Sequence, residues 1–196
     1  MTGHRLPTRD TAYFEKLYAA NPDPWNFADS AYEREKYAAT INMLGGRHFS
    51  HGLEIGCSIG VLTKRLANVC DKLLAVDLVV QALTQAGSRC AGVGDVTFER
   101  MQVPQNWPTG SYDLIVLSEI LYFLNPDDIA RTAALADASL MTGGVMLLVN
   151  YTEDINEPCD GDGAAELFMQ CAGPASIRVD RLRSRSFRID LLMKKG

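Results

Sequence analysis

The sequence is poor in the residues that metal sites and disulfide frameworks require. Of its 196 residues, three are histidines and five are cysteines. The cysteine count is odd and contains no C-x-x-C pair, so the pattern indicates neither a disulfide framework nor a zinc site. The expected alternative is reduced thiols that pack as small apolar side chains in a cytoplasmic protein. We therefore expect no bound metal.

Basic residues are also in the minority. The chain has 19 lysines and arginines against 24 acidic residues, a net charge of -5. Proteins that bind nucleic acid usually present a basic surface, so no nucleic-acid partner is expected. No apolar run is long enough to span a bilayer, and residues 1–18 lack the apolar core of a secretory signal. With 47% hydrophobic and 22% charged residues, the composition predicts one folded domain over 1–196 in the cytoplasm.

From residue 51 onward, short apolar runs alternate with helical patterns. Strands are expected at HGLEIG, KLLAVDLV, Val96–Met101, YDLIVLS and VMLLVNY. Helices are expected at GVLTKRLANVC, Val80–Cys90, a segment that starts at Asn125-Pro126-Asp127-Asp128 and ends before Gly143-Gly144, and Ala164–Cys171. The final SIRVDRLRSRSFRIDLLMKK reads as an antiparallel hairpin. This alternation predicts a doubly wound α/β fold with a mostly parallel seven-stranded sheet and a C-terminal hairpin.

Two further helices are expected before the first strand. Asp10 is a candidate N-cap for a helix that ends at Ala20. Ser30-Ala31-Tyr32-Glu33 matches a capping box, in which serine and glutamate satisfy each other's helix-start amides. That second helix should run to about Leu44 and end at Gly45-Gly46. Residues 1–46 are therefore expected to form a helical cover.

The stretch LEIGCSIGVLT, residues 53–63, fits two different motifs. Gly56-Cys57-Ser58-Ile59-Gly60 matches G-x-S-x-G, which presents a nucleophilic serine in α/β hydrolases. That motif needs an acid and then a histidine after the serine, whereas the histidines at positions 4, 48 and 51 all precede Ser58. The alternative is the glycine loop of a nucleotide-type cofactor fold, where a small Ser58 lets a ligand approach. Because no histidine follows Ser58 in the sequence, the cofactor-loop interpretation is favoured.

Asp77 supports the cofactor interpretation. It closes the second expected strand, 77 − 54 = 23 residues after Glu54. An acid at this point binds ribose hydroxyls in dinucleotide folds, because a carboxylate accepts two hydrogen bonds from a diol. A helix cap or a surface acid is the simpler alternative for Asp77 taken alone. A dinucleotide loop, G-x-G-x-x-G, would need glycine where Val61 stands.

The spacing Glu54-x-Gly56-x-Ser58-x-Gly60 instead resembles motif I of the class I, Rossmann-like S-adenosylmethionine-dependent methyltransferases. The resemblance continues through Asp77, the segment SYDLIVLSEILYFL and Gly143-Gly144, and its one departure is Ser58 in place of the usual glycine. The segment NPDPWNFADSAYEREKYAATINML is similar to the rhizobial nodulation N-methyltransferases of the NodS type, and the likeness covers essentially the whole chain.

This resemblance implies a cofactor and an acceptor. The cofactor would be S-adenosyl-L-methionine, with S-adenosyl-L-homocysteine as its product. The acceptor would be a chitooligosaccharide, methylated on the free amine of its deacetylated non-reducing-end glucosamine during Nod factor biosynthesis. Residues 1–46 would then cover the cofactor site. Residues implied to bind the cofactor are Trp25, Tyr32, Lys36, Glu54, Gly56, Cys57, Ser58, Gly60, Asp77, Leu78, Met101, Gln102 and Ser118.

The reacting centre is expected after the fourth strand, because open α/β sheets bind ligands at the carboxyl ends of their strands. Glu119 is the candidate that holds the acceptor amine and takes its proton, with Tyr122 beside it as the second catalytic candidate. Glu119, Tyr122, Asn150 and Tyr151 are expected to line the acceptor cleft. The alternative is that Glu119 caps the next turn and Tyr122 packs on it; for Trp25 the alternative is core packing.

Two rival functions remain open. One is a small-molecule N- or O-methyltransferase with the same cofactor, and the other is a nucleotide-binding module without catalysis. The arginines at 178, 181, 183, 185 and 188 suggest either a grip on an anionic group or a solvated hairpin face. The solvated face is the expected one of these two.

Overall fold

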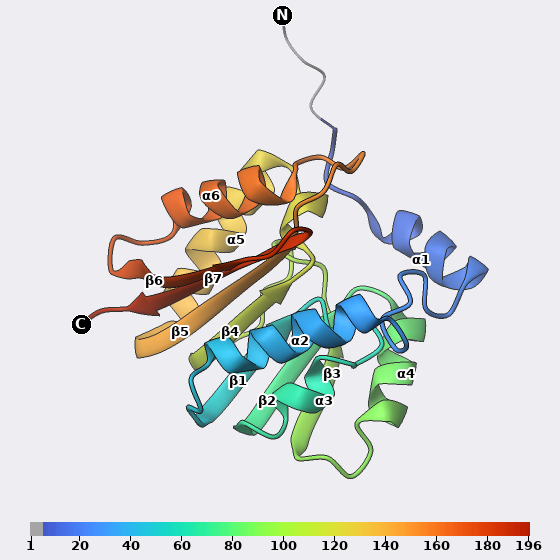
Figure 1. The fold of residues 1–196 in the computed structure, drawn as a ribbon, viewed down its shortest axis with the longest axis horizontal. Coiled ribbons are helices and arrows are strands. Elements are labelled where there is room, and N and C mark those ends of the chain that lie inside the picture. The colour runs from blue at the N-terminus through green and yellow to red at the C-terminus, as the bar shows by residue number, and fades with distance from the viewer. Residues whose placement is uncertain (1–5) are drawn as a thin grey trace, which may run out of the picture.

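The computed structural model describes residues 6–196 and contains one seven-stranded sheet (Figure 1). Its order is β3-β2-β1-β4-β5-β7-β6. The strands are β1 Phe49–Ile55, β2 Cys70–Asp77, β3 Asp95–Arg100, β4 Tyr112–Ser118, β5 Leu140–Tyr151, β6 Ser176–Arg183 and β7 Phe187–Lys194. Within the described residues, the pairs β5–β7 and β6–β7 are antiparallel and the other four pairs are parallel. The predicted sheet and hairpin are confirmed, and the strand order reverses between β1 and β4, where such sheets bind ligands.

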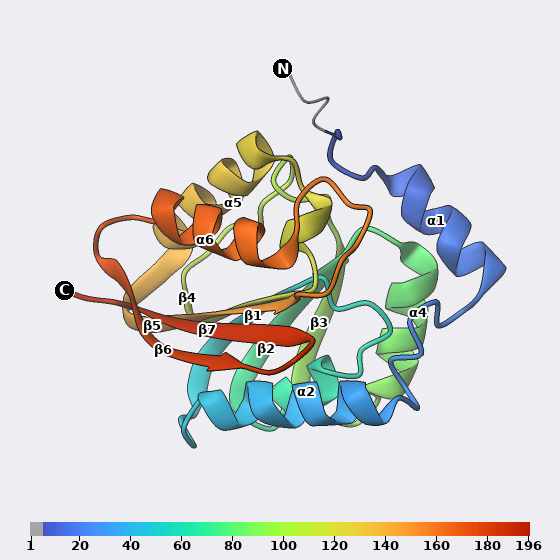
Figure 2. The ribbon, with the colours of Figure 1, turned by 45° about the horizontal axis from the view of Figure 1, so that its top comes forward.

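Helices cover both faces of this sheet. They are α1 Thr11–Ala20, α2 Ala31–Met43, α3 Thr63–Leu66, α4 Val80–Arg89, α5 Pro126–Ser139 and α6 Gly161–Cys171, with a 3-10 turn η1 Leu121–Phe123. Figure 2 shows α5 and α6 on one face and α2 across the other, with α1 beside α4. Phe14 and Tyr18 of α1 pack with Val79 and Ala82 at the start of α4. In the part of the chain described, no helix combines the length and apolarity needed to cross a membrane.

The predicted helix starts are confirmed in their capping residues. The Asp10 carboxylate accepts from the Tyr13 amide at 2.9 Å, and the Asn125 amide oxygen accepts from the Asp128 amide at 2.9 Å. Each cap satisfies one backbone N–H group that the helix itself cannot pair. The N-terminal ends of α1 and α5 are therefore set by the capping residues that the sequence predicts.

The capping box at the start of α2 is only half formed. The Ser30 hydroxyl accepts from the Glu33 amide at 3.3 Å. The Ser30 amide, however, bonds to the Asn26 carbonyl at 3.1 Å, and the Glu33 carboxylate accepts from the Lys36 ammonium at 2.9 Å. The expected reciprocal bond is therefore wrong, because the buried lysine is a stronger partner for this carboxylate than a backbone amide.

Three element boundaries differ from the sequence prediction. The helix expected over residues 60–70 is reduced to α3, because Val69 already pairs with Phe49 and β2 begins at once. Strand β5 begins at Leu140, so Gly143-Gly144 lies inside it at an irregularity in its pairing with β4. Helix α6 begins three residues earlier than expected, where the Asp160 carboxylate accepts from the Gly163 amide at 2.7 Å.

Four of the five hairpin arginines are paired with the protein's own carboxylates, and Arg185 is exposed. Arg188, only 2% exposed, contacts Asp190 at 2.7 Å, Glu166 at 2.9 Å and Asp162 at 3.0 Å. Ion pairs to the same carboxylates also hold the arginines at 178, 181 and 183. The solvated-face prediction is therefore wrong for Arg188: the network joins β6 and β7 to α6.

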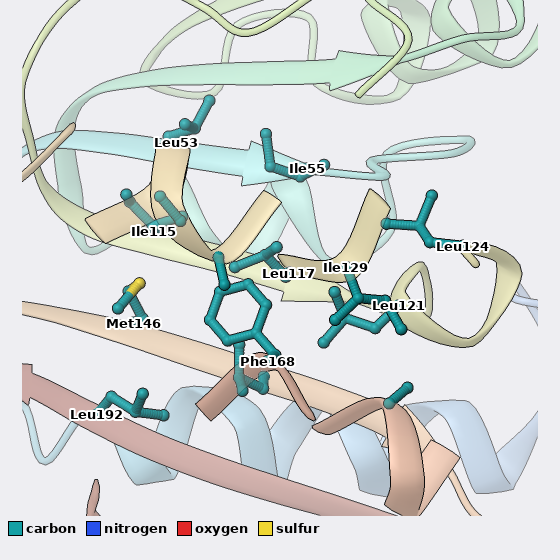
Figure 3. Packing of buried hydrophobic residues seen from close by; sticks show 14 of the residues in the cluster. Leu53, Ile55, Ile115, Leu117, Leu121, Leu124, Ile129, Met146, Phe168 and Leu192 are labelled. Carbon is teal, nitrogen blue, oxygen red and sulfur yellow. The ribbon is translucent and has the colours of Figure 1, made fainter. Parts of the chain in front are cut away.

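The core beneath α5 and α6 is built from buried side chains of β1, β4, β5 and β7 together with those of η1, α5 and α6. Figure 3 shows Phe168 of α6 among them. Residues fully excluded from solvent there include Leu53, Ile115, Leu117, Leu121, Ile129, Met146, Phe168 and Leu192. This layer fixes the carboxyl ends of β1 and β4, from which the site described below is built.

Phe168→Ala should lower the free energy of unfolding by about 3–5 kcal/mol, because a fully buried phenyl ring is replaced by a cavity. Chemical denaturation followed by circular dichroism measures the change. Val80→Ala, at a 55% exposed position of α4, is the control and should leave the stability nearly unchanged. Equal stabilities for the two variants would contradict the packing described.

Candidate active site

A cavity of about 440 Å³ lies at the carboxyl ends of β1, β2 and β4. Residues of α1, α2 and the segment between them form part of its wall. Most residues predicted from the sequence meet there: Trp25, Tyr32, Lys36, Glu54, Gly56, Cys57, Ser58, Asp77, Leu78, Met101, Gln102, Ser118, Glu119, Tyr122 and Tyr151. The structure thus brings together side chains that lie up to 126 residues apart, from Trp25 to Tyr151 (151 − 25).

Two of the predicted residues lie outside this lining. Gly60 has φ +81°, and a Cβ atom there would lie 2.8 Å from the Ala86 Cα, so this glycine lets the loop pack against α4. Asn150 is fully buried, and its Cβ lies close to Gly161 at the start of α6. The structure therefore gives Gly60 a packing function and keeps Asn150 away from the cavity wall.

The loop after β1 depends on backbone conformations that glycine favours. Gly56 has φ +83°, and a Cβ atom there would come within 2.2 Å of the Ile120 side chain. Ser58 has φ +48°, in the left-handed region that costs a residue with a side chain about 1–2 kcal/mol. Its amide donates to Asp77 at 2.9 Å. The strain at Ser58 explains why glycine is the usual residue at this position of motif I.

The nucleophile alternative for Ser58 gains no support from its neighbours. Its hydroxyl lies 2.5 Å from the Tyr18 hydroxyl. His48 pairs with Asp71 at 2.8 Å next to the amino end of β1, and His51 is also in that half of the strand. His4 falls outside the described residues. Within residues 6–196, no histidine lies beside Ser58 to take its proton, so the hydroxyl lacks a general base.

Glu54 is a buried carboxylate at the wall of the cavity. It is 1% exposed, and its Oε2 atom has no hydrogen-bond partner. Burial, together with the nearby Asp77, raises the pKa of Glu54 to about 7. Buried polar atoms are normally satisfied, so an unpaired carboxylate oxygen at a cavity indicates a missing donor or cation. An ammonium group, such as the one on the methionyl part of S-adenosylmethionine, fits this position.

Asp77 orders the loops on both sides of it. One carboxylate oxygen accepts from the Ser58 amide and the other from the Val79 amide, each at 2.9 Å. Burial raises the pKa of Asp77, which these backbone hydrogen bonds oppose. Each oxygen can accept a further hydrogen bond, so the carboxylate can also receive the two hydroxyls of a ribose. Asp77 can therefore bond backbone amides, as the capping alternative expects, and still bind a ligand.

Asp77→Ala should weaken binding of S-adenosylhomocysteine by about tenfold to hundredfold, since hydrogen bonds to a charged group contribute about 1.5–3 kcal/mol. Isothermal titration calorimetry measures the affinity. Asp71→Ala, at the opposite end of β2, is the matched control and should bind as the wild type does. Unchanged affinity in a natively folded Asp77→Ala protein would contradict the assignment of Asp77 to the cofactor site.

A group of aromatic side chains from α1, the segment between α1 and α2, and η1 lines one side of the cavity. Trp25 is 37% exposed and stacks on Phe27 with ring centroids 5.5 Å apart, while Tyr18 meets it edge-on at 5.8 Å. Phe14 and Phe123 complete the group, and all five line the cavity. The core-packing alternative for Trp25 is therefore not supported. The sequence prediction missed the four rings other than Trp25.

Glu119 is the most densely bonded side chain in the cavity. Its Oε1 atom accepts from Lys36 at 2.7 Å, and its Oε2 atom accepts from the Tyr122 hydroxyl at 2.7 Å and the Tyr151 amide at 3.0 Å. Its backbone has φ +59°, a strained conformation of the kind that clusters at functional sites. No side chain caps η1. The predicted alternative, in which Glu119 caps the next turn, is therefore wrong.

Tyr122 remains a protonated donor to Glu119. It is 8% exposed, and burial and the adjacent carboxylate raise its pKa well above the ordinary range for a phenol. Tyr151 contributes its backbone amide to Glu119 and its ring to the cavity wall. The two tyrosines and Lys36 hold one carboxylate in place at the end of β4.

The strand order, the loop after β1 and the acids at the ends of β1 and β2 define a class I S-adenosylmethionine-dependent methyltransferase. Comparison with known proteins agrees with this class and narrows it. The model of the family described as Nodulation protein S (NodS) matches residues 10–161. The chain belongs to the NodS family.

The relatives support this membership over different lengths. Nodulation protein S of Sinorhizobium fredii is 28% identical over 180 residues, which cover 90% of this chain and 83% of that protein. Nodulation protein S of Azorhizobium caulinodans is 34% identical over 112 residues, 57% of this chain and only 54% of that protein. The crystal structure of N-methyltransferase NodS from Bradyrhizobium japonicum WM9 with S-adenosyl-L-homocysteine has the same fold. Its TM-score is 0.81 at 22% identity, over 96% of this chain and all of that one.

Proposed function

We propose that this protein transfers a methyl group from S-adenosylmethionine to the free amine of a deacetylated, non-reducing-end glucosamine in a chitooligosaccharide, a step of Nod factor biosynthesis. Membership of the NodS family supports the acceptor. The observation that carries the reaction type is the Glu119 carboxylate, which lies in the cavity that the motif I loop also lines. The proposed site residues are those that line this cavity, in one domain, and the proposed location is the cytoplasm.

The cofactor, once bound, supplies an activated methyl group on a sulfonium. The protein's own contribution is then mainly placement, which is worth about 7–11 kcal/mol for well-oriented reactants. The Glu54 carboxylate is available for an ammonium, and Asp77 is available for hydroxyl groups. The loop from Gly56 to Ser58 lines the same cavity with small residues.

Glu119 is proposed to prepare the acceptor. An amine attacks a methyl group only through a free lone pair, so an ammonium must first lose a proton. A carboxylate can hold the ammonium by charge, accept its proton and leave the lone pair oriented. Glu119 is suited to this because Lys36, Tyr122 and Tyr151 fix its position. Tyr122 would keep the carboxylate oriented as the proton moves.

A comparison of two acceptors tests this function. Release of S-adenosylhomocysteine is followed with a deacetylated chitooligosaccharide and with its fully N-acetylated counterpart. We expect turnover with the first and none with the second, because an amide nitrogen has no free lone pair to attack with. Equal turnover would indicate transfer to oxygen, and turnover with neither would leave a different acceptor or a binding module as the function.

A further inference from the structure

The carboxylate of Glu33, a residue of the capping-box pattern, is part of a buried ionic cluster in the cavity. Lys36 lies between two acids, with its Nζ 2.9 Å from Glu33 Oε1 and 2.7 Å from Glu119 Oε1. The lysine side chain is 2% exposed, and those of Glu33 and Glu119 are 6% and 12% exposed. All three residues line the cavity. The cluster therefore belongs to the proposed acceptor site rather than to the surface.

The charges of this cluster do not cancel. Burial lowers the pKa of Lys36, but Glu119 and Glu33 outweigh that effect and raise it, so the side chain remains an ammonium. Burial raises the pKa of Glu33, and the adjacent Lys36 ammonium opposes that rise. With both acids ionised, two carboxylates and one ammonium give a net charge of -1 (−2 + 1). The tyrosines around the cluster, Tyr32, Tyr37 and Tyr122, are neutral phenols because burial raises the pKa of each. No other basic side chain among the described residues contacts these carboxylates.

The Glu33 side chain also has an unsatisfied atom. Its Oε2 atom is buried and has no partner in good hydrogen-bond geometry, although the neighbouring Tyr37 hydroxyl interacts with this carboxylate and acts to lower its pKa. A buried carboxylate in this state costs free energy, and a solely structural counterion for Lys36 is not required, since Glu119 already pairs with that lysine. Without Glu33, the pair of Lys36 and Glu119 would be neutral and would offer a cation no net attraction.

We propose that Glu33 is a positioning residue that, by neutralising Lys36, leaves the charge of Glu119 free to attract a protonated primary amine as the acceptor. This inference rests on the proposed function and adds a requirement: the acceptor binds as a cation to a cluster of net charge -1. Lys36 holds the Glu119 carboxylate in place, and Glu33 prevents the lysine from cancelling the charge of that carboxylate.

Charge-restoring variants test this. Glu33→Gln keeps the size of the side chain and an oxygen for Lys36, but makes the cluster neutral. We expect the KM for the amine to rise on the order of tenfold, the effect of one screened charge–charge contact. Glu33→Gln combined with Lys36→Met returns the net charge to -1, so the KM should recover most of that loss. The kcat of this double variant should stay below that of the wild type, because Lys36 no longer holds Glu119 in place. Glu35→Gln, on the exposed side of the same helix, is the matched control with wild-type kinetics.

A purely structural function for Glu33 predicts the opposite order. The double variant has lost every hydrogen bond of Lys36, so it would then be worse than Glu33→Gln. That result would overturn the proposal, as would an unchanged KM in Glu33→Gln. A loss of affinity for S-adenosylhomocysteine in Glu33→Gln would also overturn it, because Glu33 would then serve the cofactor.

The acceptor itself is tested separately in the same experiment. The variants are compared on a deacetylated chitooligosaccharide and on a panel of simple primary amines that includes glucosamine and ethanolamine. If the wild type uses an amine other than the oligosaccharide, the proposed acceptor is wrong, and the order of the variants on that amine still tests the cluster. If the wild type uses no amine at all, both proposals fail.

Discussion

Glu119→Gln should lower turnover by about a hundredfold to ten-thousandfold, the usual effect of removing a general base. The amide oxygen can still accept from the Tyr122 hydroxyl and the Tyr151 amide, while the amide NH2 then faces Lys36, which keeps its bond to Glu33. It can neither attract an ammonium nor take its proton. Affinity for S-adenosylhomocysteine should change little. Initial rates on a deacetylated chitooligosaccharide give the effect, with Glu99→Gln on the exposed end of β3 as the control.

The residual rate of Glu119→Gln should rise with pH. A glucosamine amine lies next to electron-withdrawing oxygens, so its pKa is below the value of about 10.4 for a lysine. The fraction of neutral amine therefore grows as the solution becomes more alkaline, and bulk solvent replaces the missing base. A pH–rate profile that coincides with that of the wild type would show that Glu119 only supports the structure, and that placement alone carries the chemistry.

Ser58→Leu should abolish methyl transfer and binding of the cofactor. Ser58 lines the cavity with φ +48°, and a larger branched side chain would both fill that space and strain the backbone further. Calorimetric titration with S-adenosylhomocysteine and initial rates should both fall below detection. Retained cofactor affinity in this variant would show that the loop after β1 does not face the ligand.

Ser58→Gly should keep the activity, because glycine adopts this conformation without strain and leaves the same space. It loses the contact with the Tyr18 hydroxyl, so a moderate decrease in cofactor affinity is compatible with the account. A nucleophilic serine predicts a different result, since removal of the hydroxyl would then stop catalysis. An inactive Ser58→Gly enzyme with normal cofactor affinity would restore the nucleophile interpretation.

The sequence predicted the helices and strands correctly wherever no tertiary contact competed with the local pattern. The continuous apolar runs at β2 and β4 predicted covered parallel strands, and Asp10 and Asn125 predicted helix starts. The prediction failed where a tertiary contact competed with the local pattern. The helix after Gly60 is short because Val69 pairs with Phe49.

The sequence motifs predicted which residues meet at the site, but they did not predict which side chains pair with one another there. Glu54 and Asp77 lie at the carboxyl ends of β1 and β2, and Glu119 directly follows β4, so their convergence at one edge of the sheet could be expected. The approach of Lys36 to Glu119 across 83 residues could not, since it depends on how α2 crosses the sheet. The i, i+3 spacing from Ser30 to Glu33 predicts a capping box, while the same spacing from Glu33 to Lys36 fits an ion pair equally well.

The most direct test of the central claim is the position of the transferred methyl group. A deacetylated chitooligosaccharide is incubated with the protein and S-adenosylmethionine that carries a carbon-13 methyl group, and the product is analysed by NMR spectroscopy and fragment mass spectrometry. The account predicts the label on the nitrogen of the non-reducing-end glucosamine. A label on oxygen, or on nitrogen of another residue of the oligosaccharide, would contradict it.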